Sequence, residues 1–121
     1  MKQKKIWVPL FEWAITLLEV QAPKDHKKVN KILKEFGVDE ESRKRIKDEN
    51  IRDCINGGDH FYSKSMKKSI IVLSRMSNNK QRNHILCHEK RHIEDRMMET
   101  YCINDVETAG MLAGYLGKKL I

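Results

Sequence analysis

The chain has 121 residues, which is enough for one compact domain over 1–121 but not for two independent cores. Its composition, 40% hydrophobic and 34% charged, excludes a disordered chain and a membrane-embedded one, since no apolar run is long enough to span a bilayer. The net charge of +7 leaves nucleic acid as a less favoured partner, because the basic residues are spread along the chain without interleaved aromatics.

The cysteines are three in number, Cys54, Cys87 and Cys102, and no two form a CxxC pair. An odd count without paired spacing disfavours a disulfide framework and favours a reducing compartment. We therefore expect a cytoplasmic protein, with Cys87 as a buried thiol in its core.

The first twenty residues begin basic and continue apolar, which loosely resembles a signal peptide. However, Glu12, Thr16 and Glu19 interrupt the apolar run at helical spacing and form a narrow polar stripe. This pattern predicts a helix over about 10–21 that faces the core or a partner.

Two more helices are predicted before residue 50. Apolar residues on one face predict a helix over about 24–36, and Gly37 is well placed to end it. The very polar segment 39–48 predicts a short exposed helix. We therefore expect residues 1–50 to form a helical N-terminal part.

The segment 51–121 begins with strands. A turn cluster, Asn56–Asp59, precedes a short strand over 60–62, and the β-branched run SIIVLS over 69–74 is the best strand in the chain. Together they predict a β-hairpin.

Two helices follow the predicted hairpin. Asn78 can cap a helix, with Gln81 as its capping-box partner, and this helix should run to about residue 99. A last helix should start near residue 104 or 105 and continue to the C-terminus. The expected fold class is α+β: a mostly helical domain with a short hairpin packed on its longest helix.

The segment HEKRH matches the pattern H-E-x-x-H on this predicted helix. His88 and His92 are four residues apart, so their imidazoles share one helical face and can occupy two corners of a tetrahedral zinc site. Glu89 can reach a metal-bound water without binding the metal, and can act as the general base that accepts its proton. These residue types predict a zinc-dependent hydrolase.

A catalytic zinc site needs a third protein ligand and an open fourth position. Asp95 lies three residues after His92 on the same helix, and Glu107 lies 15 residues after His92 in the first turn of the next one. Glu107 has an alternative role, because Asn104 and Glu107 have the spacing of a capping box. Spacing alone leaves the two ligand candidates open.

The stretch from Gly57 to Gly117 resembles the small zincins associated with bacterial phages and mobile elements. Four segments carry the resemblance: GGDHFY, SIIVL, HEKRH and ETAGMLAGYLG. The wider class, the gluzincins, takes its third zinc ligand from a glutamate on a following helix, which implies that role for Glu107. The resemblance also implies a metallopeptidase that cleaves a peptide or amide bond, with SIIVL as an edge strand that binds an extended peptide.

The last predicted helix carries small residues at helical spacing, Gly110, Ala113, Gly114 and Gly117, which would allow close approach to the zinc-binding helix. Lys90, Arg91 and Glu94 depart from the family pattern, which keeps the two middle residues of the motif uncharged and the residues after the second histidine apolar. These charges are tolerable if that side of the helix is solvated. They favour a second hypothesis, a zincin-like protein that binds metal without cleaving and serves in assembly.

Four further side chains could take part in a zinc site: His60, His84, Tyr101 and Tyr115. His60 could orient a substrate but is expected to be an exposed residue beside the turn, and His84 is expected on the helix surface. The tyrosines could stabilise an oxyanion, although packing is the expected role. A third hypothesis is a basic nucleic-acid-binding domain in which HEKRH occurs by chance.

Overall fold

The computed structural model describes residues 1–121 and contains a four-stranded mixed sheet with helices on both faces, so the expected α+β class is confirmed. The strands are β1 (Lys2–Val8), β2 (Trp13–Glu19), β3 (Gly58–Ser63) and β4 (Lys68–Leu73). The helices are α1 (His26–Phe36), α2 (Glu40–Ile51), α3 (Asn79–Thr100) and α4 (Val106–Leu120).

The sheet has the order β1-β2-β4-β3. β1 pairs antiparallel with β2, β2 pairs parallel with β4, and β4 pairs antiparallel with β3. Since β4 is hydrogen-bonded on both sides, the expectation that SIIVL is an edge strand is wrong. The two free edges belong to β1 and β3.

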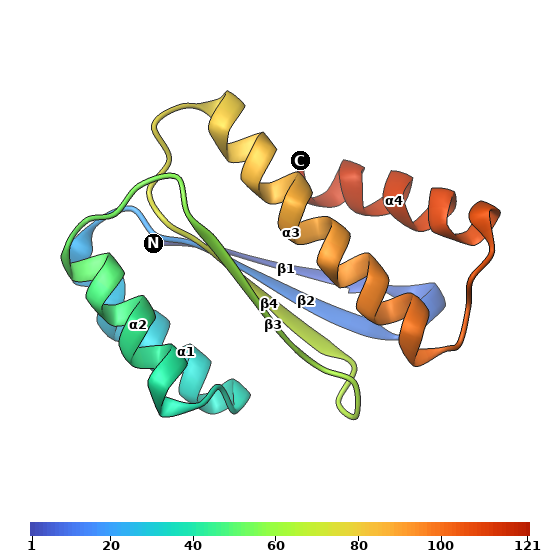
Figure 1. Ribbon diagram of the computed structural model, residues 1–121, viewed down its shortest axis with the longest axis horizontal. Coiled ribbons are helices and arrows are strands. Elements are labelled where there is room, and N and C mark those ends of the chain that lie inside the picture. Colours follow the sequence, from blue (N-terminus) through green and yellow to red (C-terminus); the bar gives the residue numbers. More distant parts are fainter.

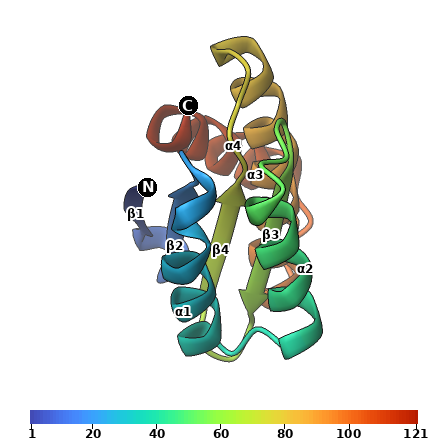
Figure 2. The ribbon, with the colours of Figure 1, turned by 90° about the vertical axis from the view of Figure 1, so that its left-hand side faces the viewer.

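The helices form two layers, one on each face of the sheet (Figures 1 and 2). α1 and α2 cover one face, and α3 and α4 cover the other. Two buried clusters lie beneath them. The larger, on the α3 and α4 side, includes Trp13, Ile15, Leu17, Ile71, Leu73, Leu86, Ile93, Met97 and Leu116. The smaller includes Leu18, Val29, Leu33, Ile46, Ile70 and Val72.

The helix expected over 10–21 is wrong, since most of this segment is β2 and a short 3-10 turn joins it to β1. β2 lies inside the sheet with a helical layer over each face, so nearly all of its residues are apolar and the alternation typical of a half-exposed strand is missing. Glu12, one member of the apparent polar stripe, is left-handed in the turn, with a φ of 49°. β1 escaped prediction because four of its seven residues are exposed and polar.

The other expected elements are confirmed with small shifts of their ends. Gly37 ends α1 in the left-handed region, with a φ of 100°. β3 and β4 form the predicted hairpin, and the Asn78 side chain accepts a hydrogen bond from the Gln81 amide at the start of α3. α4 ends one residue before the C-terminus.

The glycines of α4 do not have the expected packing role. A methyl group added at Gly110, Gly114 or Gly117 would meet no heavy atom within 4 Å. These positions therefore do not bring α4 unusually close to another element, and that interpretation of their spacing is wrong.

Two further expectations concern the cysteines and the membrane. All three cysteines are free and exposed, so the expectation that Cys87 is a core thiol is wrong. No helix of the protein combines the length and the apolar character that a bilayer crossing requires.

Candidate metal centre

His88 and His92 lie one turn apart on α3, as their spacing predicts. The Nε2 atoms of the two imidazoles are 3.1 Å apart, and the ring planes are nearly perpendicular, at 84°. His88 is exposed and His92 is half-buried. The pair therefore presents two nitrogen donors close together on an accessible side of the helix.

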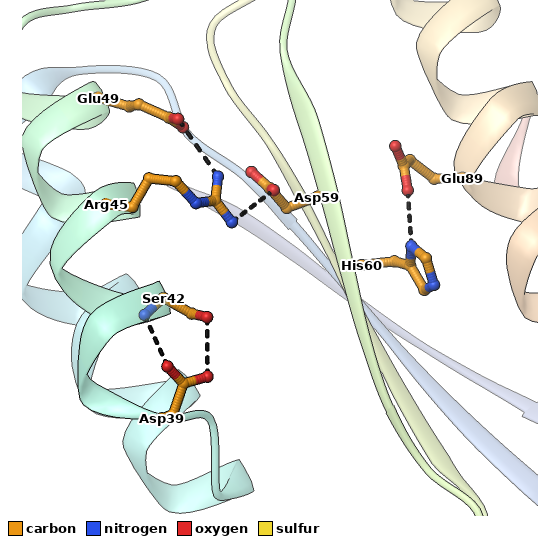
Figure 3. A network of polar contacts seen from close by, with 7 residues as sticks. All are labelled: Asp39, Ser42, Arg45, Glu49, Asp59, His60 and Glu89. Carbon is orange, nitrogen blue, oxygen red and sulfur yellow. Dashed lines mark hydrogen bonds and ion pairs between the residues drawn. The ribbon is translucent and has the colours of Figure 1, made fainter.

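Glu89 is directed inward from α3 and is only 6% exposed. Its Oε2 lies 3.1 Å from Nδ1 of His60 on β3 (Figure 3). An ionised carboxylate can only accept a hydrogen bond, so Nδ1 of His60 carries the hydrogen and donates it. This contact engages Nδ1 and leaves Nε2 as the ring nitrogen of His60 that is not bound to Glu89.

His60 faces α3 because of the strand pleat. Successive residues of β3 point to opposite faces of the sheet, so Asp59 is directed toward α2 while His60 is directed toward α3 (Figure 3). Asp59 accepts an ion-paired contact from Arg45 of α2 at 3.0 Å. Burial raises the pKa of Asp59 above its ordinary value, although the hydrogen bond and charge of Arg45 oppose this.

The ring of His60 also stacks on that of His92. The two ring centroids are 4.7 Å apart and the planes are 8° from parallel. His60, Glu89, His88 and His92 thus form one contiguous group, which we call the histidine cluster. It joins an edge strand of the sheet to the middle of α3.

Gly58 allows β3 and α3 to approach closely enough for these contacts. A methyl group at Gly58 would lie 2.6 Å from Cγ2 of Ile85 and 3.3 Å from Cγ of Glu89. The second of these atoms belongs to the histidine cluster. A side chain at this position would therefore push apart the two elements that form the cluster.

Glu107 is not part of this cluster. It is exposed in the first turn of α4, and α4 packs against the other side of α3, where Nζ of Lys90 donates to the Ala113 carbonyl at 3.5 Å. Each residue of an α-helix turns about 100° around the axis, and Lys90 is two residues after His88. The side of α3 that carries Lys90 and Glu94 is therefore about 200° around the helix from the side that carries His88 and His92. The structure therefore does not bring Glu107 together with the two histidines.

The structure also shows where the other acidic candidates of this region lie. Asp105 caps α4 by accepting from the Thr108 amide, so the expected capping box from Asn104 to Glu107 is not formed. Asp95, the alternative third ligand, is exposed and lies 3.7 Å from Arg91. Neither acidic candidate contacts a histidine of the cluster.

Two of the charged residues that depart from the family pattern, Lys90 and Glu94, are paired with each other. They form an ion pair at 3.0 Å and their side chains are 13% and 9% exposed. The condition that this side of α3 is solvated is therefore not met for Lys90 and Glu94, because α4 covers them. Arg91, in contrast, is exposed as expected.

The hydroxyl groups of both tyrosines form hydrogen bonds away from the histidine cluster. The hydroxyl of Tyr115 donates to the Trp7 carbonyl at 2.8 Å, and that of Tyr101 donates to the Phe11 carbonyl. They fasten α4 and the end of α3 to β1 and the turn after it. His84 is exposed on α3, as expected.

No three or more His, Cys, Asp or Glu side chains are arranged to hold a metal ion as the side chains stand. His88 and His92 are brought together, Glu89 is brought to His60, and Glu107 is apart. The contact between His60 and Glu89 is not predicted from the sequence, because 29 residues separate them. The signal that could have found it is the GGDHFY strand itself, which places a histidine one residue beyond the turn.

No protein-family model, curated protein or solved structure matches the chain. The likeness to the small zincins therefore rests on the motifs of the sequence alone.

Proposed function

We propose that this protein binds a zinc ion through His88 and His92 and is a zincin-like hydrolase of peptide or amide bonds. The hydrolase proposal carries over the HEKRH pattern and the likeness to the zincins. The histidine pair on α3 supports the metal-binding part. The free edge of β3, which packs against α3, supports the binding of an extended peptide by backbone hydrogen bonds.

The distance between the two imidazole nitrogens carries the proposal. Two nitrogen ligands bound to a tetrahedral zinc ion lie about 3.3 Å apart, given zinc–nitrogen bonds of about 2.0 Å. The Nε2 atoms of His88 and His92 are 3.1 Å apart, which is close to the separation that one ion would require of them. The chemistry of the donors also fits, because imidazole is a preferred zinc ligand.

A bound zinc ion would supply an acidified water molecule as the nucleophile. Glu89 would accept a proton from that water. One of its oxygens is held by His60, and the other, Oε1, accepts no hydrogen bond from the protein and can serve as the base. The contact with His60 would keep this buried carboxylate in one orientation.

A second candidate is a zincin-like protein that binds metal but does not cleave, with a role in the assembly of a phage or mobile element. The observation that favours it is the position of Glu107, which is apart from the histidines. Zinc binding without cleavage of any member of a broad peptide library would favour this candidate over the first.

Metal analysis of the purified protein tests the proposal. We expect about one zinc per chain, lost in His88→Ala and in His92→Ala. His84→Ala is the matched control, since it removes an exposed imidazole from the same helix and should leave zinc content unchanged. A metal-free native protein that takes up no added zinc would refute the proposal. DNA or RNA binding that weakens with salt and ignores a chelator would then favour a nucleic-acid-binding domain.

Glu89→Gln separates binding from catalysis. The amide has nearly the same shape as the carboxylate but cannot accept the proton, so we expect zinc to be retained and hydrolysis of a peptide library to fall by at least about a hundredfold. Hydrolysis at the wild-type rate would remove Glu89 from the role of general base.

A further inference from the structure

The third donor of a zinc site at His88 and His92 has no obvious source on α4, but β3 supplies one. We infer that His60 is the third zinc ligand, through its Nε2 atom, and that Glu89 is the residue that orients it. The inference rests on the proposed zinc binding of the α3 pair. It differs from the glutamate-ligand arrangement that the likeness to gluzincins implies.

The distances of His60 and His88 from the ring of His92 support this assignment. Three imidazoles bound to one tetrahedral zinc ion have ring centroids about 5 Å apart, from zinc–nitrogen bonds of about 2.0 Å and the size of the ring. The centroids of His60 and His92 are 4.7 Å apart, and those of His88 and His92 are 4.6 Å apart. Two of the three ring pairs therefore lie at nearly the spacing of a metal-bound set, with His92 between the other two rings.

The hydrogen bond between His60 and Glu89 supports it as well. A histidine that binds a metal through one ring nitrogen almost always donates a hydrogen bond from the other, commonly to a carboxylate. Nδ1 of His60 donates to Glu89 at 3.1 Å, and Glu89 is buried and so held in place. This contact selects the tautomer in which Nε2 is free to bind zinc.

One movement is required. The rings of His60 and His92 are nearly parallel, so their nitrogen lone pairs do not yet point to a common position. His60 must tilt out of the stack while it keeps its contact with Glu89. The partial exposure of His60, whose side chain is 18% exposed, leaves room on the solvent side for such a tilt.

Zinc affinity measured by competition with a chromophoric chelator tests the inference. His60→Ala should weaken zinc binding by more than a hundredfold, as should His88→Ala and His92→Ala. Glu89→Ala, which removes the acceptor of the His60 hydrogen bond, should cost about 10–100-fold, the usual effect of losing a partner that orients a ligand. Glu107→Ala and His84→Ala should bind zinc as the wild type does.

Two results would overturn the assignment of His60, and a third would remove the proposed zinc site as well. If His60→Ala binds zinc with wild-type affinity while the α3 variants do not, His60 is not a ligand, although the proposed zinc binding stands. If Glu107→Ala alone among the acidic variants abolishes binding, the third ligand comes from α4 instead. A wild-type protein that binds no zinc would remove both proposals.

A spectroscopic measurement covers the case in which His60→Ala is unstable. In wild-type protein with ¹⁵N-labelled histidine, saturation with zinc should move the Nε2 resonances of His60, His88 and His92 to metal-bound values. Nδ1 of His60 should remain protonated because it still donates to Glu89. An Nε2 resonance of His60 that does not respond to zinc would overturn the inference without any substitution.

Discussion

Lys90 and Glu94, both on α3, form an ion pair on the side of the helix that α4 covers, and their side chains are nearly buried. Removing one partner of such a pair leaves the other charge buried and uncompensated, whereas replacing both by apolar residues is often harmless. Lys90 lies inside the HEKRH motif and Glu94 lies two residues after it, yet both are on the opposite side of the helix from the two histidines. Their role is therefore structural and separable from the metal centre.

We expect Lys90→Met to lower the free energy of unfolding by about 3 kcal/mol, because Glu94 is left unpaired under α4. The double variant Lys90→Met with Glu94→Leu should recover most of this loss. Chemical denaturation measures both.

Arg91→Met is the matched control. It removes an exposed arginine from the same helix, and its pair with Asp95 is solvated, so it should change stability by less than about 1 kcal/mol. Equal losses in Lys90→Met and Arg91→Met would contradict the buried-pair interpretation.

Among the elements, α4 and β3 use glycine in opposite ways. Gly110 and Gly114 lie on open parts of α4, where glycine only weakens the helix. Gly58 lies where β3 touches α3, and a methyl group there would meet Ile85 at 2.6 Å. The same residue type is therefore dispensable in one element and required in the other.

Gly110→Ala and Gly114→Ala should each raise the free energy of unfolding by about 0.5–1 kcal/mol, because alanine has the higher helix propensity and meets no neighbour. Gly58→Ala should lower it, because β3 must move away from α3. Thermal unfolding of the three variants would check this. A destabilised Gly110→Ala would mean that α4 packs more closely than these contacts indicate.

The sequence predicts most helices of the fold but not its first two strands. Local signals such as the Gly37 cap and the Asn78 cap act within a few residues, so α1 and α3 are readable from the chain. β2 is not, since a strand covered on both faces is as uniformly apolar as a buried helix. Its true nature depends on partners more than fifty residues away in β4.

The candidate site is predictable in part for the same reason. The pair His88 and His92 follows from helix periodicity alone. The contact between His60 and Glu89 depends on which face of β3 packs on α3, and a shift of one residue in strand register would replace His60 with its neighbour. Register is set by the whole sheet, so this half of the cluster could not be read from local pattern.

At the scale of the whole molecule, the histidine cluster links the sheet to the α3 and α4 layer. A zinc ion held by side chains of both β3 and α3 would bind the folded protein and not the unfolded chain. Such binding stabilises the fold by mass action, by about 2.7 kcal/mol when free zinc is a hundred times the dissociation constant.

We therefore expect zinc at this excess to raise the melting temperature by on the order of 10 °C, and a chelator to reverse the rise. Differential scanning calorimetry with and without zinc measures the effect. The double variant His88→Ala with His92→Ala provides the control and should show no shift. An equal shift in that variant would mean that zinc binds elsewhere on the protein.

The free edge of β1 has a consequence for how copies of this chain meet. An exposed strand edge offers unpaired backbone groups to any similar edge, which is a common route to aggregation. Along β1 the exposed residues include Lys2, Lys4 and Lys5, whose charges would repel the same edge of a second copy. Acetylation of these lysines would remove that repulsion and should therefore promote edge-to-edge pairing of β1 between two copies of the chain.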